Sequence, residues 1–127
     1  MKLNPDCVRD ILLFIEANTD LKTPISFKEE NVTQYFPQYP HAETLYHLRQ
    51  CELSGFFEKV SHGYGELFTI SYLSPAGHEF IAYLRNDTFF SKVKDVGKEL
   101  GIDTLKGLTQ IAAASAATLI KSHFGLP

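Results

Sequence analysis

The sequence predicts an α+β fold that is mainly helical, and two observations near its centre favour this class. A helical pattern ends at Ser54-Gly55 and leads at once into two short runs, 56–61 and 67–73, that are rich in aromatic and β-branched residues. Ser74-Pro75 then marks the start of another helix. A helix that passes through a glycine into a two-stranded ribbon is the layout of a winged helix. We therefore expect a winged helix-turn-helix core with two additional C-terminal helices.

Length and composition fit one ordered domain with an appended segment. The chain has 127 residues, of which 44% are hydrophobic and 21% are charged, and these proportions are ordinary for a globular protein. We expect residues 1–86 to form the winged-helix domain. Residues 87–127 are expected to form a helical C-terminal extension that serves as an oligomerisation element.

Cysteine usage and the pattern of apolar residues indicate a cytoplasmic protein. Cys7 and Cys51 both fall inside helical patterns, where thiols are expected to be buried rather than joined in a disulfide. The first six residues begin a capped helix instead of the apolar stretch of a signal peptide. No membrane contact is expected, because no apolar run reaches the roughly 18 residues that a spanning helix needs.

The charge balance argues against strong nonspecific DNA binding by a monomer. The formal net charge is -3. The range from Pro40 to Arg85 contains three basic and five acidic residues. A duplex-binding protein normally presents a basic face, because neutralising phosphates releases counterions and supplies much of the affinity.

The first helix is predicted from Pro5 to about Asn18. Asn4 supplies the N-cap, and Pro5 stands where its missing N–H does no harm.

Residues 19–39 show no clear helical or strand pattern over most of their length. The run 23–27 is a candidate for a short third strand, whereas residues 29–35 lack a clean apolar stripe. The first helix of the helix-turn-helix is therefore expected to be short, distorted or replaced by a loop.

The helix from Pro40 to Ser54 is the candidate recognition helix. Its apolar residues spread over more than half of the helical circumference, so periodicity leaves its phase ambiguous. His47-Leu48, a further apolar residue at Cys51 and the ending 54–57 resemble the recognition helix of many bacterial winged-helix regulators. The register that this resemblance implies turns Thr44, Leu45, Leu48 and Cys51 to the core and His41, Glu43, Tyr46, Arg49 and Gln50 outward.

This outer face is the predicted DNA-binding surface. Arg49 and Gln50 have side chains of the types that read guanine and adenine edges. The residues expected to approach the groove are His41, Tyr46, Arg49 and Gln50, with Lys59 of the hairpin touching the backbone. Tyr64, at the glycine-flanked tip, is expected either to stack on a sugar or partner surface or to be an ordinary exposed aromatic. The alternative for the whole face is a solvated helix surface without a ligand.

The segment Leu73-Ser74-Pro75-Ala76-Gly77 resembles the Leu-Ser/Thr-Pro-x-Gly signature that follows the wing in many such domains. Ser74 is expected to cap this helix. Its predicted buried face consists of Gly77, Phe80, Ile81 and Leu84. The next helix is expected to be capped by Asp87-Thr88 and to end at Gly101, with Phe89, Phe90, Val93, Val96 and Leu100 inward and Lys92, Lys94 and Lys98 outward.

The last helix is expected to open at Asp103-Thr104 and to run to about His123. Its apolar stripe consists of Leu105, Leu108, Ala112, Ser115 and Leu119. Small residues at the centre of this stripe allow close approach of a second helix. We favour self-association over internal packing, because a winged-helix core is complete without this helix. Binding to a membrane surface is less favoured, because the helix has little polar face.

The whole chain is similar to an uncharacterised bacterial and prophage family, domain of unknown function 2513. The segments that carry this resemblance are the opening residues 1–10, the central residues 45–55, residues 73–82 and residues 108–113. The resemblance implies a small, often phage-borne cytoplasmic protein and carries over no functional residues.

Motifs typical of catalysis or metal binding are nearly absent from the sequence. His47 and Cys51 have a spacing that can place two metal ligands together, but no second pair completes a tetrahedral site. No phosphate-binding loop, nucleophile elbow or paired acidic motif is present. We therefore expect no enzyme activity, no metal and no cofactor.

Two functional hypotheses follow. The first is a homo-oligomeric DNA-binding or transcription-regulator-like protein, in which the C-terminal helix pairs protomers so that two weak modules act together. The alternative is a protein-protein adaptor, in which the winged helix and the alanine-rich last helix bind a host or phage protein without DNA. A neutral or negative outer face on the helix at 40–54 favours the adaptor.

Overall fold

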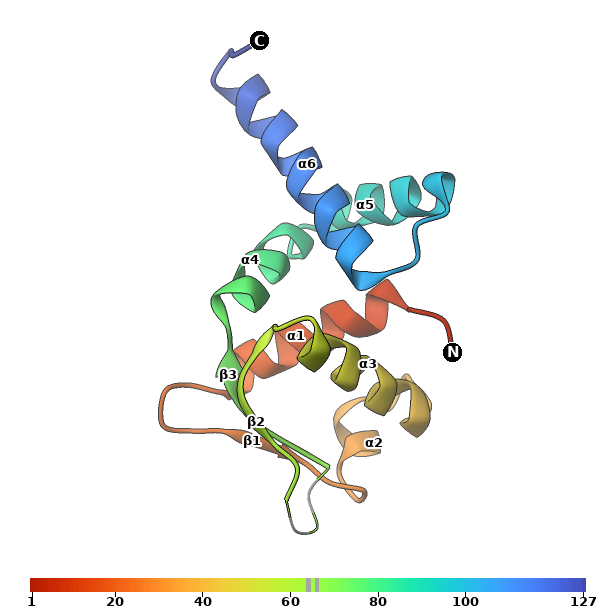
Figure 1. Cartoon of the computed structure of the whole chain (residues 1–127), viewed down its shortest axis with the longest axis vertical. Coiled ribbons are helices and arrows are strands. Elements are labelled where there is room, and N and C mark those ends of the chain that lie inside the picture. The colour runs from red at the N-terminus through yellow and green to blue at the C-terminus, as the bar shows by residue number, and fades with distance from the viewer. Residues whose placement is uncertain (64, 66) are drawn as a thin grey trace.

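The computed structural model describes residues 1–63, 65 and 67–127 of the chain. The fold is α+β and mainly helical, which confirms the predicted class. The described residues form six helices and a three-stranded antiparallel sheet, whose arrangement is shown in Figure 1. In chain order the elements are α1 (Pro5–Asn18), β1 (Ile25–Phe27), α2 (Val32–Tyr35), α3 (His41–Leu53), β2 (Phe57–Ser61), β3 (Phe68–Leu73), α4 (Pro75–Leu84), α5 (Asp87–Leu100) and α6 (Leu105–His123).

The sheet has the order β1-β3-β2, so the hairpin strand β3 lies in the middle. Ile70 of β3 pairs with Ile25 of β1 on one side and with Val60 of β2 on the other. The prediction of a short third strand within residues 23–27 is therefore confirmed. Helix α2 has four residues, which confirms the expectation of a short helix before α3.

Helix α1 forms the centre of the core. It begins at the predicted cap, where the Asn4 side chain accepts a hydrogen bond from the Asp6 backbone N–H. It lies in the middle of the molecule, with the sheet, α2 and α3 on one side and α4, α5 and α6 on the other (Figure 1). Its fully buried side chains are Cys7, Val8, Ile11, Leu12 and Ile15. This arrangement makes α1 the support on which α3 rests.

The passage from α3 through the hairpin into α4 is fixed by backbone hydrogen bonds. Gly55 has a φ of 76°, and the Phe56 N–H returns to the Cys51 carbonyl, which is the hydrogen bond that closes a helix with a left-handed residue. Ser74 caps α4 by accepting from the Gly77 N–H, and its hydroxyl donates to the Gly55 carbonyl. A Cβ at Gly77 would collide with the Phe56 carbonyl oxygen. The predicted glycine turn and Ser-Pro helix start are therefore confirmed, and they lie in direct contact.

Helix α5 requires two corrections to the sequence prediction. Its cap is Asn86, whose side chain accepts from the Phe89 N–H, and Asp87 is already the first helical residue. Leu100 is 63% exposed instead of facing the core, because the helix has run past its buried contacts when it ends at Gly101. Phe90, Val93 and Gly97 do face inward.

Helix α6 is divided into a buried half and an exposed half. Leu105, Leu108 and Ala112 are at most 4% exposed and pack within the chain against α4 and α5. These three residues therefore do not form an intermolecular seam, which corrects the expectation for them. The absence of a Cβ at Gly97 allows this packing, because a Cβ there would meet the Leu108 side chain at 3.1 Å. The buried core thus continues without a break from residues 1–86 into the extension.

The second half of α6 extends beyond the rest of the fold (Figure 1). Ser115 is half-buried, and Leu119 is 53% exposed. Three further large apolar residues are exposed toward the C-terminus, namely Ile120, Phe124 and Leu126. Among the residues that the structure describes, none of the helices combines the length and apolar character that crossing a bilayer requires.

Candidate functional site

The inner face of α3 fixes how the helix lies on the core. Thr44, Leu48 and Cys51 are buried and Leu45 packs against the core, as the register predicted. His47 is also fully buried, which the sequence interpretation missed. The signal was present, because positions 44, 47, 48 and 51 form one stripe at helical spacing.

Both ring nitrogens of His47 make hydrogen bonds to backbone groups. The Asn4 N–H donates to Nε2 at 2.8 Å, so Nδ1 carries the proton and donates to the Glu43 carbonyl at 2.7 Å. The neutral ring thereby links the start of α1 to the first turn of α3. With both nitrogens engaged, His47 is a structural side chain in this site.

The outer face of α3 brings together three of the four predicted groove-facing residues. Tyr46, Arg49 and Gln50 are spaced three and four residues apart and share one face. Arg49 is 53% exposed, whereas Tyr46 and Gln50 are half-buried. Leu53, which is 64% exposed, lies on the same face and was missed by the sequence interpretation. His41 is five residues before Tyr46 and lies toward the edge of this surface.

The two candidate residues His41 and Arg49 on α3 each contact a carboxylate. His41 Nε2 lies 2.9 Å from Glu29 Oε2, and Arg49 Nη1 lies 2.7 Å from Glu52 Oε1. Glu43 and Glu58 add further negative charge on α3 and β2. The candidate surface is therefore balanced or acidic, unlike the basic faces that attract DNA from a distance.

The hairpin contributes Lys59 and His62. Lys59 is exposed and has a φ of 47°, a conformation that is uncommon outside glycine. His62 joins the hairpin to the end of α3, because its Nε2 lies 2.9 Å from Glu52 Oε2. Tyr64 and Glu66 lie outside the described residues, so the predicted role of Tyr64 stays a prediction.

Glu52 links these elements by accepting from Arg49 and His62 at once. Burial alone raises the pKa of Glu52, but the hydrogen bonds from His62 and Arg49 outweigh this effect and leave its pKa below the ordinary value. The same contact raises the pKa of His62, with a second contribution from its hydrogen bond to the Leu67 carbonyl. One carboxylate thus holds an arginine of α3 and a histidine of the hairpin.

The buried cysteines lack the properties of reactive or metal-binding thiols. Burial raises the pKa of Cys7 to about 12, with smaller contributions from Asp10 and Glu43. Burial likewise raises the pKa of Cys51 far above its ordinary value. Thiols with raised pKa values stay protonated at neutral pH, whereas the thiolate is the nucleophile and the metal ligand. Within the described part of the chain, no group of three or more His, Cys, Asp or Glu residues is placed to hold a metal ion.

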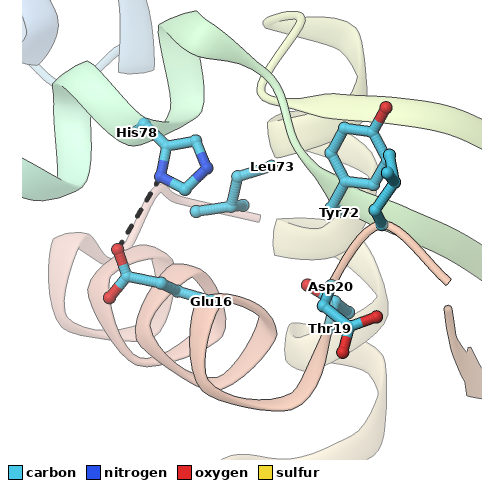
Figure 2. Close-up of a pocket in the computed structure, with 7 residues that line it drawn as sticks. Glu16, Thr19, Asp20, Tyr72, Leu73 and His78 are labelled. Carbon is cyan, nitrogen blue, oxygen red and sulfur yellow. Dashed lines mark ion pairs between the residues drawn. The ribbon is translucent and has the colours of Figure 1, made fainter. Parts of the chain in front are cut away.

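A second candidate region is a cavity of about 250 Å³ between the end of α1 and the start of α4. Glu16 and His78 point toward one another there, with Tyr72 and Asp20 on the lining (Figure 2). Both Glu16 oxygens already accept from Arg85, at 2.9 and 2.8 Å. The Arg85 hydrogen bonds hold the pKa of Glu16 below its ordinary value. We interpret this group as a joint between α1 and α4, because its carboxylate is already engaged by the protein.

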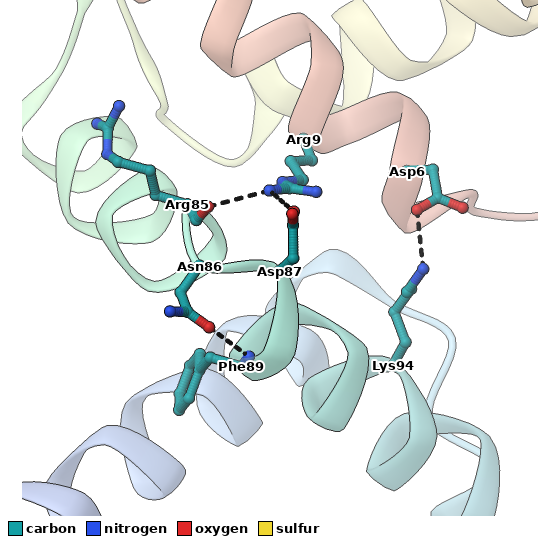
Figure 3. Close-up of polar contacts among 7 residues, drawn as sticks. All are labelled: Asp6, Arg9, Arg85, Asn86, Asp87, Phe89 and Lys94. Atoms are coloured by element: carbon teal, nitrogen blue, oxygen red, sulfur yellow. Dashed lines mark hydrogen bonds and ion pairs between the residues drawn. The ribbon is translucent and has the colours of Figure 1, made fainter.

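A third polar group fastens α5 to α1. Arg9 donates to Asp87 and to the Arg85 carbonyl, and Lys94 donates to Asp6 at 2.9 Å (Figure 3). Both cations also lie over the Phe90 ring, at 4.8 and 4.6 Å from its centroid. These contacts attach the C-terminal helices to the core and account for Lys94 being half-buried rather than fully outward.

Comparisons with known proteins identify relatives but no activity. The model of a family described as "Hypothetical protein (DUF2513)" matches residues 2–103. A protein of Haemophilus influenzae called "Uncharacterized protein" is 26% identical over 115 residues, which cover 88% of this chain and 92% of that protein. No solved structure matches the chain. The family match ends before α6, so the buried and exposed halves of that helix lie outside the matched region.

Proposed function

The chain belongs to this family of proteins with a domain of unknown function, and from that premise we propose that it is a winged-helix DNA-binding protein without enzyme activity. The order α1, β1, α2, α3, β2, β3 supports the winged-helix assignment, because a short helix precedes the candidate recognition helix and a hairpin follows it directly. The sheet order β1-β3-β2 also agrees with a wing completed by a third strand.

The observation that carries the proposal is the outer face of α3. Tyr46, Arg49 and Gln50 share this face while the opposite face is anchored in the core. An arginine can form a bidentate contact with guanine, and a glutamine can do so with adenine. Lys59 projects from the adjoining strand, where it is able to meet a phosphate.

The charge of this surface implies weak binding by a single copy. Because Arg49 and His41 are already paired with carboxylates, little long-range attraction to phosphates remains. We propose that two copies associate through the exposed half of α6, so that two weak contacts act together. The exposed Leu119, Ile120, Phe124 and Leu126 support this role. An open groove of about 490 Å³ beside them, lined in part by Tyr83 and Phe89, supports it as well.

Solution mass tests the association. The wild-type protein is expected to have the mass of an oligomer, and Leu119→Asp with Phe124→Asp is expected to give the monomer mass. Leu21→Asp is the matched control, because Leu21 is 81% exposed and lies far from α6 in the chain. A wild-type monomer at all concentrations, or an oligomer that survives the double variant, contradicts this part of the proposal.

A DNA titration at two salt concentrations tests the binding itself. A labelled duplex of mixed sequence should bind more weakly at the higher salt concentration, and Arg49→Ala should weaken binding by about tenfold, as loss of a base contact does. Arg85→Ala is the matched control, because Arg85 is 54% exposed and is also paired with a glutamate, but it lies at the end of α4. The proposal fails if the wild type shows no salt-dependent binding, or if Arg49→Ala and Arg85→Ala weaken DNA binding equally.

A protein-protein adaptor is the second candidate, and two observations favour it. The outer face is balanced or acidic, and Leu53 is exposed on it beside Tyr46 and Arg49. An exposed apolar residue within a polar rim is typical of a protein contact. Two results would support the adaptor hypothesis. The wild-type protein would not bind duplex DNA, and a pull-down followed by mass spectrometry would find a host or phage protein that binds the wild type but not Leu53→Asp.

A further inference from the structure

Where α3 meets the base of the β2–β3 hairpin, a single carboxylate bridges two basic side chains. Arg49 Nη1 lies 2.7 Å from Glu52 Oε1, and His62 Nε2 lies 2.9 Å from Glu52 Oε2. Arg49 is the proposed guanine-reading side chain, so the carboxylate competes directly with DNA for it. Whatever neutralises Glu52 also weakens its hold on Arg49.

The geometry around His62 favours the doubly protonated ring. Its Nδ1 lies 2.7 Å from the Leu67 carbonyl oxygen, and its Nε2 faces the Glu52 carboxylate. A carbonyl oxygen and an ionised carboxylate only accept hydrogen bonds, so both ring nitrogens must donate for both contacts to form. His47 is the opposite case, because one of its nitrogens accepts from a backbone N–H.

Among the residues that the structure describes, the charged groups that act on His62 are Glu52 and Arg49. From α3 it faces Glu52, with Arg49 acting through the same carboxylate. It also meets the uncharged carbonyl of Leu67, which precedes β3, and the Phe68 ring of β3, whose centroid is 4.9 Å away. The C-terminal end of α3 adds a partial negative charge, which also favours a cation there. Of the described residues, Glu52 contributes most to the raised pKa of His62.

We propose that His62 is a positioning residue that controls, through Glu52, how readily Arg49 engages duplex DNA. This inference rests on the proposed DNA-binding function. When His62 is an imidazolium, Arg49, Glu52 and His62 together have a formal net charge of about +1. Glu52 is then attracted to two cations at once. When the ring loses its proton, the net charge falls by one. Glu52 then has Arg49 as its remaining cationic partner and holds it more tightly.

The expected consequence is tighter DNA binding at lower pH. Anisotropy of a fluorescein-labelled 30-base-pair duplex of mixed sequence is measured at about pH 6 and about pH 8, at fixed ionic strength, because histidine side chains commonly change charge within this range. Wild-type affinity should be about three- to tenfold higher at the lower pH, because a weaker hold of Glu52 on Arg49 restores part of the contact between the guanidinium and a base. His62→Gln should bind as weakly at both values as the wild type does at the higher one.

Two further variants make the test specific. Glu52→Gln releases Arg49 without a change of shape, so it should bind more tightly than the wild type and lose most of the pH dependence. His78→Gln is the control, because His78 is also exposed and near a glutamate but lies on α4. It should keep the full pH dependence. Circular dichroism of each variant checks that it is folded.

The outcomes separate the two proposals. If the wild type binds the duplex but His62→Gln keeps the same pH dependence, the positioning role is overturned and the DNA-binding proposal stands. The positioning role is likewise overturned if Glu52→Gln binds more weakly than the wild type. If the wild type binds no duplex at either pH, the DNA-binding proposal fails and the positioning role fails with it.

Discussion

The two faces of α3 use histidine and polar contacts in opposite ways. On the inner face, His47 is fully buried and both its nitrogens meet backbone groups. On the outer face, Arg49 and His62 meet a glutamate, and both are about half exposed. Exposed ion pairs contribute little to stability and are screened by salt. The inner contacts therefore hold the helix in place, whereas the outer contacts can be replaced by contacts with a ligand with little loss of stability.

The largest difference in stability between the two faces of α3 should appear when one leucine on each face is replaced by alanine. Leu48 is fully buried, so Leu48→Ala leaves a cavity and should lower the free energy of unfolding by about 2–5 kcal/mol. Leu53→Ala removes the same atoms from the exposed face of the same helix and should change it by less than about 0.5 kcal/mol. Urea denaturation measures both. Equal losses would show that the outer face is buried in an assembly.

The next difference concerns the histidines. His47→Leu leaves the Asn4 N–H without its acceptor and should destabilise the protein by about 1–3 kcal/mol. His41→Leu breaks only a partly exposed contact with Glu29 and should cost less than about 1 kcal/mol. Thermal denaturation of both variants at one pH gives the comparison. A harmless His47→Leu would mean that the link between α1 and α3 is not structural.

A smaller effect should depend on pH. His62 has a raised pKa, so its contribution to stability is full below the ordinary value of 6.5 and is lost as the pH rises through its folded value. Glu52 has a lowered pKa, so its contribution is full above 4.5 and is lost as the pH falls through its folded value. The stability difference between wild type and His62→Gln should therefore be greatest between pH 4.5 and 6.5. At about 0.2–1 kcal/mol it needs repeated denaturant titrations. A difference that grows above pH 8 would contradict the assignment.

The smallest expected effect has the opposite sign. Lys59 adopts a left-handed conformation that costs a non-glycine residue about 1–2 kcal/mol, while glycine loses about 0.5–1 kcal/mol of flexibility on folding. Lys59→Gly should therefore be neutral or stabilising by up to about 1 kcal/mol. Glu58, in the same strand, does not have a positive φ, so Glu58→Gly removes no backbone strain and should destabilise the protein. If both glycines destabilise equally, the conformation of Lys59 carries no strain.

The parts of the fold that the sequence predicted are those specified by short-range signals. Asn4-Pro5, Ser54-Gly55 and Ser74-Pro75 set helix ends through neighbouring backbone groups, and all three occur where expected. The third strand at β1 was also within reach, because its aromatic and β-branched residues suit a sheet. These features depend on residues a few positions apart.

The parts that were missed depend on residues distant in the sequence. The first half of the α6 stripe packs on α4 and α5, and periodicity cannot say whether an apolar stripe meets its own chain or another. Glu52 and His62 belong to different elements, and their pairing exists only once the hairpin folds back on α3. The burial of His47 was visible in its spacing, but its acceptor role depends on Asn4, 43 residues away.

The most direct test of the division between the faces of α3 is an NMR titration of the ¹⁵N-labelled full chain with a mixed-sequence duplex. We expect shifts in the amides of Tyr46, Arg49 and Gln50 and in β2 near Lys59, while those of Leu48, Cys51 and α1 stay unchanged. Shifts confined to the exposed half of α6, or no shifts at all, would contradict the account.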